Sequence, residues 1–208
     1  MSEFIQTIPR QRKPRGHGSE RKAEILAAAT RIFLQEGVAG ATMRRIASEV
    51  GVSPTALYVY FPDKEAILEA IAQAWFFELL GVLQASQANQ TSVEGAFRAG
   101  LRAYVEFGLA RPDSYRLTFL SRPDNRDGKL PCDDIPEADY SFAVLQSGVE
   151  AMMQAGQFRP GDSTAIAETI WAALHGLTVI VIDQAEHLKT APNRLIEQML
   201  DMVVRGFG

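Results

Sequence analysis

Short hydroxyl, apolar and aromatic side chains lie together in the segment 41–65, whose sequence is ATMRRIASEVGVSPTALYVYFPDKE. Groups of these types bind nucleic acid, because a hydroxyl bonds a phosphate oxygen or a base edge and an apolar group packs on the methyl group of thymine. If residues 54–60 form a helix, its outer face presents Thr55, Ala56, Tyr58, Val59 and Tyr60. The chemistry that this segment predicts is therefore recognition of DNA.

The residues before this face predict a short helix that ends in a sharp turn. Thr42 is a side-chain N-cap, and the apolar residues after it recur at spacings of three and four, which leaves Arg44 and Arg45 outside. Gly51 stands where a helix ends in the left-handed region, and Val52 packs back after such a turn. The residues expected on the buried side are Met43, Ile46, Ala47 and Val50.

A second helix follows directly. Ser53 is its N-cap and Pro54 occupies its first position, where the missing N–H group costs no hydrogen bond. Leu57 and Phe61 face inward at positions i and i+4. Two helices joined in this way form a helix-turn-helix, which lays its second helix in the major groove. The same turn occurs in helical proteins that bind no nucleic acid, so spacing alone leaves both interpretations open.

Charge is distributed unevenly along the chain, and this favours the DNA-binding interpretation. Residues 1–64 contain ten Lys or Arg and six Asp or Glu, a net charge of +4, whereas residues 65–208 contain eleven and nineteen, a net charge of −8. Binding to phosphates needs a local positive field and not a positive total. We therefore predict a basic head that binds DNA and an acidic body.

The segment TMRRIASEVGVSPTALYVYFPDKEAIL resembles the N-terminal domain of TetR/AcrR-type transcriptional repressors, and the likeness includes Tyr58, Tyr60, Phe61 and Lys64. It extends upstream through ERKAEILAAATRIFLQEGVAGAT, where we expect a first helix that Gly37 ends. The buried stripe of that helix is Ile25, Ala28, Ala29, Ile32 and Phe33. The resemblance covers residues 19–65 and implies a three-helix DNA-binding domain at 19–64.

Carried over residue by residue, the resemblance implies that Thr42 and Tyr58 contact phosphates, that Arg44 reaches a base edge and that Lys64 holds a backbone phosphate. Ala56 has no hydrogen-bonding side chain, so it contacts a base only through its methyl group. The predicted DNA-binding residues are Thr42, Arg44, Ser53, Thr55, Ala56, Tyr58, Tyr60 and Lys64.

Residues 1–18 form a basic segment before the predicted head. Four Lys or Arg stand among proline and glycine, a composition that cannot build a core, so we predict a flexible N-terminal arm. One interpretation is an arm that follows the DNA backbone or enters the minor groove. The alternative is a solvated tail.

Residues 65–208 read as helices throughout, so the predicted fold is all-α, with a small head and a larger body. The helix after Asp63 links the two parts, and the proline-rich and glycine-rich stretch 121–136 predicts a loop. The most apolar run, 166–182, is too short and too polar for a membrane span, and no signal peptide is apparent, so we expect no membrane partner. A single cysteine, Cys132, fits a reducing cytoplasm.

The body also resembles a known domain. DSYRLTF followed later by IWAALHGL is similar to the C-terminal ligand-binding domain of one branch of these regulators, named for a Trp-His-Gly signature that Trp171, His175 and Gly176 carry here. This resemblance implies a homodimer through the helices at about 162–186 and 192–206, which binds a palindromic double-stranded operator. The apolar stripe of the last helix agrees, although a monomer could bury it internally. We expect Gly176 to let two helices approach closely.

A small-molecule cavity in the body is the remaining prediction. Trp171 and His175 share a helix face, and aromatic residues of neighbouring helices can converge with them into a mostly apolar pocket for a hydrophobic effector. The alternative is that these residues are simply core. The candidate ligand-binding residues are Tyr104, Phe107, Phe119, Phe142, Met152, Trp171 and His175.

The pattern of reactive residues favours a regulator over an enzyme. The three histidines, at 17, 175 and 187, lack metal-ligand spacing, and we expect no metal, no cofactor and no catalytic residue. We predict a cytoplasmic repressor that a small hydrophobic effector releases from its operator. The alternatives are a regulator that activates or needs no ligand, and a helical small-molecule enzyme or carrier.

Overall fold

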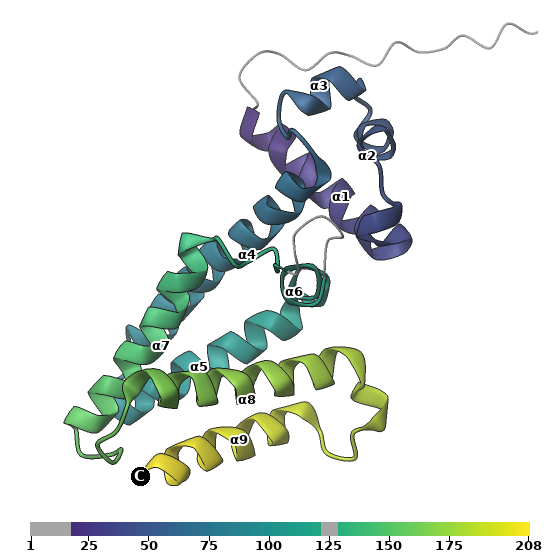
Figure 1. Ribbon diagram of the computed structural model, residues 1–208. Coiled ribbons are helices and arrows are strands. Elements are labelled where there is room, and N and C mark those ends of the chain that lie inside the picture. Colours follow the sequence, from purple (N-terminus) through teal and green to yellow (C-terminus); the bar gives the residue numbers. More distant parts are fainter. Residues whose placement is uncertain (1–17, 122–128) are drawn as a thin grey trace, which may run out of the picture.

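The computed structural model describes residues 18–121 and 129–208, and within them the chain is helical without any strand (Figure 1). This confirms the all-α prediction. The predicted N-terminal arm, apart from Gly18, and part of the predicted loop lie outside the described residues. The helices are α1 (Gly18–Gly40), α2 (Met43–Val50), α3 (Pro54–Tyr58), α4 (Lys64–Gln87), α5 (Val93–Ala110), α6 (Pro112–Phe119), α7 (Pro136–Gln154), α8 (Ser163–Asp183), the 3-10 turn η1 (Ala185–His187) and α9 (Pro192–Phe207).

The head consists of α1, α2, α3 and the first turns of α4. Gly37 has a φ of 73° and interrupts α1, as expected, but the chain resumes one more helical turn and ends at Gly40. The core of the head holds most of the predicted apolar stripes of α1 and α2 together with Leu57 and Phe61; Ala28 is buried but lies outside this cluster. Three residues of α4, Ile67, Leu68 and Ile71, complete this core.

The turn between α2 and α3 forms as the sequence predicts. The side chain of Thr42 accepts a hydrogen bond from the backbone of Arg45 at 3.1 Å, and Gly51 takes a φ of 74°. The Ser53 hydroxyl accepts from the backbone of Ala56 at 3.1 Å. Helix α3 ends at Tyr58, two residues before the predicted end, because the chain must leave the helical conformation before Pro62 and tightens into a 3-10-type bond from Tyr60 to Leu57.

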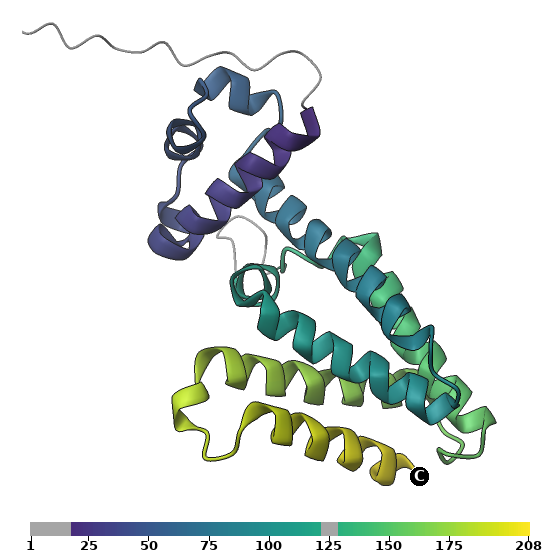
Figure 2. The same ribbon diagram turned by 180° about the vertical axis from the view of Figure 1, so that it is seen from behind.

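The body is built from the rest of α4 with α5 to α9, around a core rich in aromatic rings. Figures 1 and 2 show α4 running from the head along α7, while α8 and α9 lie side by side at the far end of the molecule. Helix α4 contributes to both cores, and Leu117 of α6 also packs into the core of the head. Helix α4 is shared by the two cores, so a domain boundary between residues 64 and 65 separates Ile67, Leu68 and Ile71 from the rest of the head core.

Two local expectations need correction. The apolar spacing after Ser92 predicts that Val93 faces inward, but Val93 is 40% exposed because it is the first residue of α5 and lines a cavity instead of the core. A Cβ on Gly176 would meet nothing within 4 Å, so this glycine does not allow a close approach inside the protomer. The close approach is at Gly108, where a Cβ would lie 2.8 Å from Thr178 of α8.

Two helices, Lys64–Gln87 and Ser163–Asp183, are long and apolar enough by length and composition to cross a membrane. Core helices of soluble proteins also meet this criterion, so it is weak support for a span. Helix α4 buries one side of its apolar surface in the two cores just described, while Phe77 stays 70% exposed.

Candidate nucleic-acid interface and ligand cavity

The outer face of α3 is open to solvent at the end of the head that lies farthest from α8 and α9 (Figure 1). Thr55 is exposed, Tyr58 is 52% exposed and Val59 is 81% exposed. Neither Tyr58 nor Val59 belongs to the core of the head. The structure therefore brings the predicted groove residues together on one accessible surface, with Ala56 half-buried between them.

The two capping hydroxyls flank this surface. Thr42 and Ser53 are exposed, and each uses an oxygen lone pair to accept a backbone N–H. Because a hydroxyl that accepts in this way keeps its own hydrogen, both side chains can still donate to a phosphate oxygen. Each hydroxyl can therefore cap its helix and contact a phosphate at the same time.

The neighbouring arginines of α2 have different surroundings. Arg45 bonds Glu49 at 2.9 Å and Glu36 at 3.2 Å, and the hydrogen bond to Glu49 raises the pKa of the guanidinium. The same bond lowers the pKa of Glu49, which Arg31 also approaches, at 3.4 Å. Arg44 is exposed and makes no ion pair with the residues that the structure describes. Of the two cations, Arg44 is the one whose charge is available to DNA.

Lys64 and Tyr60 have structural contacts besides their predicted roles. The Lys64 ammonium donates to the carbonyls of Val38 and Ala39, at 2.8 and 3.4 Å, and so ties α4 to the end of α1. An ammonium has three donors, which leaves one for a phosphate. Tyr60 is half-buried against the core of the head, so less of its ring can face the groove than the sequence suggests.

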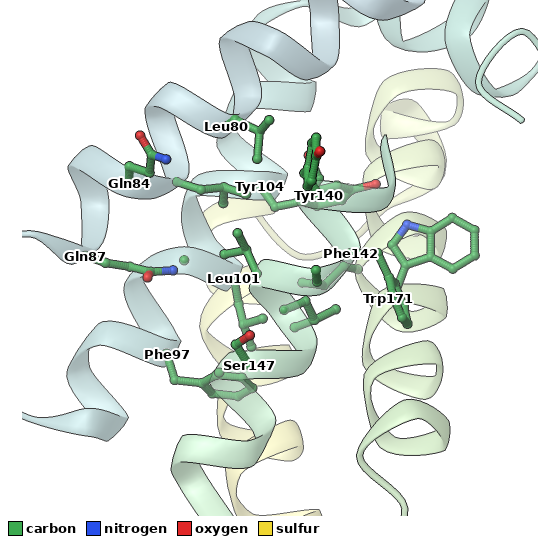
Figure 3. Close-up of a pocket in the computed structure, with 18 of the residues that line it drawn as sticks. Leu80, Gln84, Gln87, Phe97, Leu101, Tyr104, Tyr140, Phe142, Ser147 and Trp171 are labelled. Atoms are coloured by element: carbon green, nitrogen blue, oxygen red, sulfur yellow. The ribbon is translucent and has the colours of Figure 1, made fainter. Parts of the chain in front are cut away.

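A cavity of about 1100 Å³ opens in the body between α4, α5, α7 and α8 (Figure 3). Four of the predicted ligand residues line it: Tyr104, Phe119, Phe142 and Trp171. Its volume is at the upper end of the range for small-molecule sites. Two of its lining residues are also exposed to solvent: Tyr140, at 63%, and Trp171, at 40%.

The other three predicted ligand residues do not line the cavity. Phe107 packs its ring against Trp75, with the ring centroids 5.1 Å apart, and Met152 is fully buried in the body core. His175 lies behind the wall, where its Nδ1 is 2.6 Å from the hydroxyl of Tyr115. Helical spacing placed these side chains on apolar faces, but it could not distinguish the core side of a helix from the cavity side.

His175 belongs to a buried polar chain that links α5, α6 and α8. The hydroxyl of Tyr115 also lies 3.4 Å from that of Tyr104, which lines the cavity. Burial raises the pKa of Tyr104 to about 12, raises the pKa of Tyr115 further and lowers the pKa of His175. All three groups are therefore neutral at physiological pH, as a fixed structural network requires.

Sequence reasoning missed the polar residues of the cavity. Gln84 and Gln87 line it from α4, and Figure 3 shows them on the side opposite Phe142 and Trp171. Gly100 of α5 provides the space for the Gln87 side chain, since a Cβ at this position would lie 2.6 Å from the Gln87 amide nitrogen. Glu168 lines the cavity one helical turn before Trp171. The sequence does contain a signal for these residues. Gln84 and Gln87 are three residues apart, as are Glu168 and Trp171, so each pair lies on one face of its helix.

The helices predicted to pair with a second subunit keep an exposed face. Helix α9 buries Ile196, Met199, Leu200 and Val203 within the protomer, so most of its apolar stripe is satisfied internally. It is tied to α5 by ion pairs from Arg98 to Asp201, at 2.7 Å, and from Arg102 to Glu197. The apolar side chains that stay exposed on α8 and α9 include Ile180, at 42%, and Met202, at 59%.

Cys132 also lines the cavity and is half-buried. Burial raises the pKa of its thiol to about 11, so the reactive thiolate is scarce at neutral pH. No group of three or more His, Cys, Asp or Glu side chains that could hold a metal ion occurs in residues 18–121 and 129–208.

A helix-turn-helix head joined to a helical body with an internal cavity defines a DNA-binding transcriptional regulator, and comparison with known proteins agrees. Residues 25–71 match the family described as bacterial regulatory proteins, tetR family. Residues 97–203 match the tetracyclin repressor-like C-terminal domain. The chain belongs to the tetR family, whose members bind DNA and act as dimers. The narrower Trp-His-Gly branch stays a prediction.

Two relatives of known role are similar in sequence. The nucleoid occlusion factor SlmA of Actinobacillus pleuropneumoniae serotype 5b (strain L20) is 30% identical over 110 residues, which are 52% of this chain and 54% of the relative. The chain thus spans about half the length of that relative. The HTH-type transcriptional activator FasR of Mycolicibacterium smegmatis is 28% identical over 166 residues, 73% of this chain and 76% of the activator.

Solved structures share the whole fold. A Rhodococcus sp. RHA1 protein described as being of unknown function has a TM-score of 0.77 and 26% identity, and the match covers 94% of this chain and 99% of that one. The fatty acid degradation regulator FadR of Bacillus halodurans has the same TM-score at 17% identity, with 94% and 98% covered. At that identity the second likeness concerns the fold alone.

Proposed function

We propose that this regulator is a homodimeric repressor that a small, mostly hydrophobic effector releases from a palindromic operator. The head at 19–64 would bind DNA, and the body at 65–208 would bind the effector and the second subunit. The observation that carries the proposal is the cavity of about 1100 Å³, because its walls include helices that also hold the core of the head.

The exposed face of α2 and α3 supports the DNA-binding part. Arg44 offers a charge without an ion-pair partner in the described structure, and Thr42, Ser53 and Tyr58 offer hydroxyl donors on the same surface. In a dimer, two copies of α3 would enter successive major grooves about 34 Å apart. Thr55, Ala56, Tyr60 and Lys64 complete the proposed contact set.

The outer face of α8 and α9 supports the dimer. Gly176 and Ala172 leave a shallow strip on α8, and Met202 projects from α9 beside it. A small hollow of about 210 Å³ lies between the two helices and is lined by Thr169 and Ala173, among others. Small residues let helices of a second copy approach closely, so we place the interface at about 162–186 and 192–206.

The cavity is connected to the head by two helices. Phe76 of α4 lines the cavity, and Ile71 of the same helix packs in the head. Phe119 of α6 also lines the cavity, while Leu117, two residues earlier, packs in the head. A ligand that prefers one arrangement of these walls would shift the two heads relative to each other, by no more than its difference in affinity for the two states.

The experiment that tests the proposal is a mobility shift with the DNA upstream of the protein's own gene. A shift that disappears when a cavity ligand is added supports a ligand-released repressor. A shift that no cavity ligand changes supports a ligand-independent regulator, and the absence of any shift with upstream DNA overturns the DNA-binding role of the exposed α3 face.

An activating role is the second candidate, because FasR, a transcriptional activator, is similar over 73% of this chain. The same head and cavity would serve either role, and a transcription assay with and without the protein distinguishes them. We further propose that the protein is cytoplasmic and is not an enzyme, since its family and fold relatives are regulators.

A further inference from the structure

We propose that the body cavity selects a neutral or cationic amphiphile and rejects an anionic one. This inference rests on the proposed function of the cavity and names the chemical class of its ligand. The lining is mostly apolar, with Leu83, Phe97 and Leu101 among its walls, so the bulk of the ligand must be hydrophobic. The selectivity comes from the polar groups between these walls.

The charged groups of the cavity are of one sign. Glu168 of α8 and Asp139 of α7 line it, and among the described residues no lysine or arginine does. A carboxylate or phosphate on a ligand would lose its hydration in the cavity without gaining a cation, which is unfavourable. The negative net charge of residues 65–208 also repels an anionic ligand. A cation gains attraction from the same groups.

Aromatic rings line the same cavity as the two carboxylates. Glu168 and Trp171 are three residues apart on α8, so both side chains lie on one face of the helix and line the cavity together. Tyr140 follows Asp139 on α7, and Phe142 lies on the same side of the cavity as Trp171 (Figure 3). Aromatic faces combined with carboxylates are the groups that recognise ammonium ions, because the ring quadrupole gives the face a negative potential and the carboxylate carries a negative charge.

Glu168 and Asp139 are available for this role. Both are exposed, and no ion pair or hydrogen bond within the described structure engages either carboxylate. At the other side of the cavity, the Gln84 and Gln87 amides can bond a neutral polar group. The cavity therefore offers neutral amides from α4 and carboxylates from α7 and α8 within a mostly apolar lining.

The test uses three probes with the same ten-carbon chain: decyltrimethylammonium, decanol and decanoate. Binding to the full-length protein is measured by isothermal titration calorimetry below the concentrations at which the probes form micelles. We expect decyltrimethylammonium to bind about tenfold more tightly than decanoate, with decanol between them. Decanoate binding as tightly as the cation would overturn the proposal, and so would the absence of binding by all three probes.

Two variants locate the effect. Glu168→Gln should lower the affinity for decyltrimethylammonium about twofold to fivefold and leave that for decanol unchanged. Glu186→Gln, an exposed glutamate outside the cavity, is the matched control and should change neither. An unchanged cation affinity in Glu168→Gln would overturn the assignment. DNA binding is measured separately, so a protein that binds DNA but prefers decanoate refutes this inference alone, whereas a protein without DNA binding refutes the proposed function.

Discussion

Replacing Arg44 and Arg45 in turn separates the DNA-binding role of α2 from its structural role. Both arginines are exposed, and they are adjacent in the sequence. Arg45 is held by Glu36 and Glu49, whereas Arg44 has no ion-pair partner in the described chain. We expect Arg44→Ala to weaken DNA binding strongly and Arg45→Ala to weaken it little.

The magnitude follows from the number of contacts. An arginine that reaches a base edge contributes about 1–3 kcal/mol. A dimer has two copies, so Arg44→Ala should cost about 2–6 kcal/mol, which raises Kd at least about 30-fold. Arg45→Ala removes exposed ion pairs, which are typically worth about 0–1 kcal/mol to folding, and should change the Kd for DNA by less than about threefold.

The assay is fluorescence anisotropy of a labelled upstream DNA fragment at constant ionic strength, because phosphate contacts make the affinity depend on salt. Circular dichroism and sedimentation should show that both variants fold and dimerise like the parent protein. Equal losses in the two variants, or a larger loss in Arg45→Ala, would refute the assignment of Arg44 to DNA.

Further predictions concern the arm, the dimer and the body core. Deleting residues 1–16 should weaken DNA binding and flatten its salt dependence; an unchanged slope in a salt titration would support a solvated tail. Truncation before Pro192 should give monomers with poor DNA affinity, and a dimer that survives in sedimentation would place the interface elsewhere. Burial lowers the pKa of His175 below its value in the unfolded chain, so this residue contributes stability above about pH 6.5 that is lost as the pH falls. The melting temperature should therefore fall less between pH 7.5 and 5.5 in His175→Gln than in the parent, and equal pH slopes would contradict this. Gly108→Ala should lower the free energy of unfolding by about 1–3 kcal/mol, because its Cβ would lie 2.8 Å from Thr178 and 3.0 Å from the Tyr115 ring; denaturant titration measures the change, and Gly81→Ala, at an exposed position of α4 where a Cβ meets nothing within 4 Å, is the control that should cause no loss.

The sequence predicts the head almost completely because its signals are local. Thr42, Gly51 and Ser53 each act on residues within four positions, so cap, turn and cap can be read from spacing. The end of α3 was placed two residues late because helix-forming residues continue to Tyr60, while the restraint from Pro62 acts backwards along the chain.

The body is less predictable because its features depend on contacts between distant residues. Apolar periodicity identifies α5 and α8, but it does not tell which aromatic faces a cavity and which faces the core. Phe107 and Phe142 look alike in the sequence, yet only Phe142 lines the cavity. Likewise Gly108 and Gly176 both stand in apolar helices, and only Gly108 meets another helix.

The availability of Arg44 was also hidden from the sequence. The pattern places Arg44 and Arg45 outside together. Arg45 is distinguished by its pair with Glu49, four residues on, and by the approach of Glu36 from α1, which spacing alone does not predict. The link from cavity to head through α6 was missed for the same reason, since Leu117 joins the head core across a long sequence separation.

The most direct test of the switch is the Kd for upstream DNA measured by anisotropy with and without a saturating concentration of a ligand shown by calorimetry to bind the cavity. We predict that the ligand raises this Kd tenfold or more, because it changes the walls that α4 and α6 share with the head. An unchanged Kd while the ligand occupies the cavity would contradict coupling between the two sites.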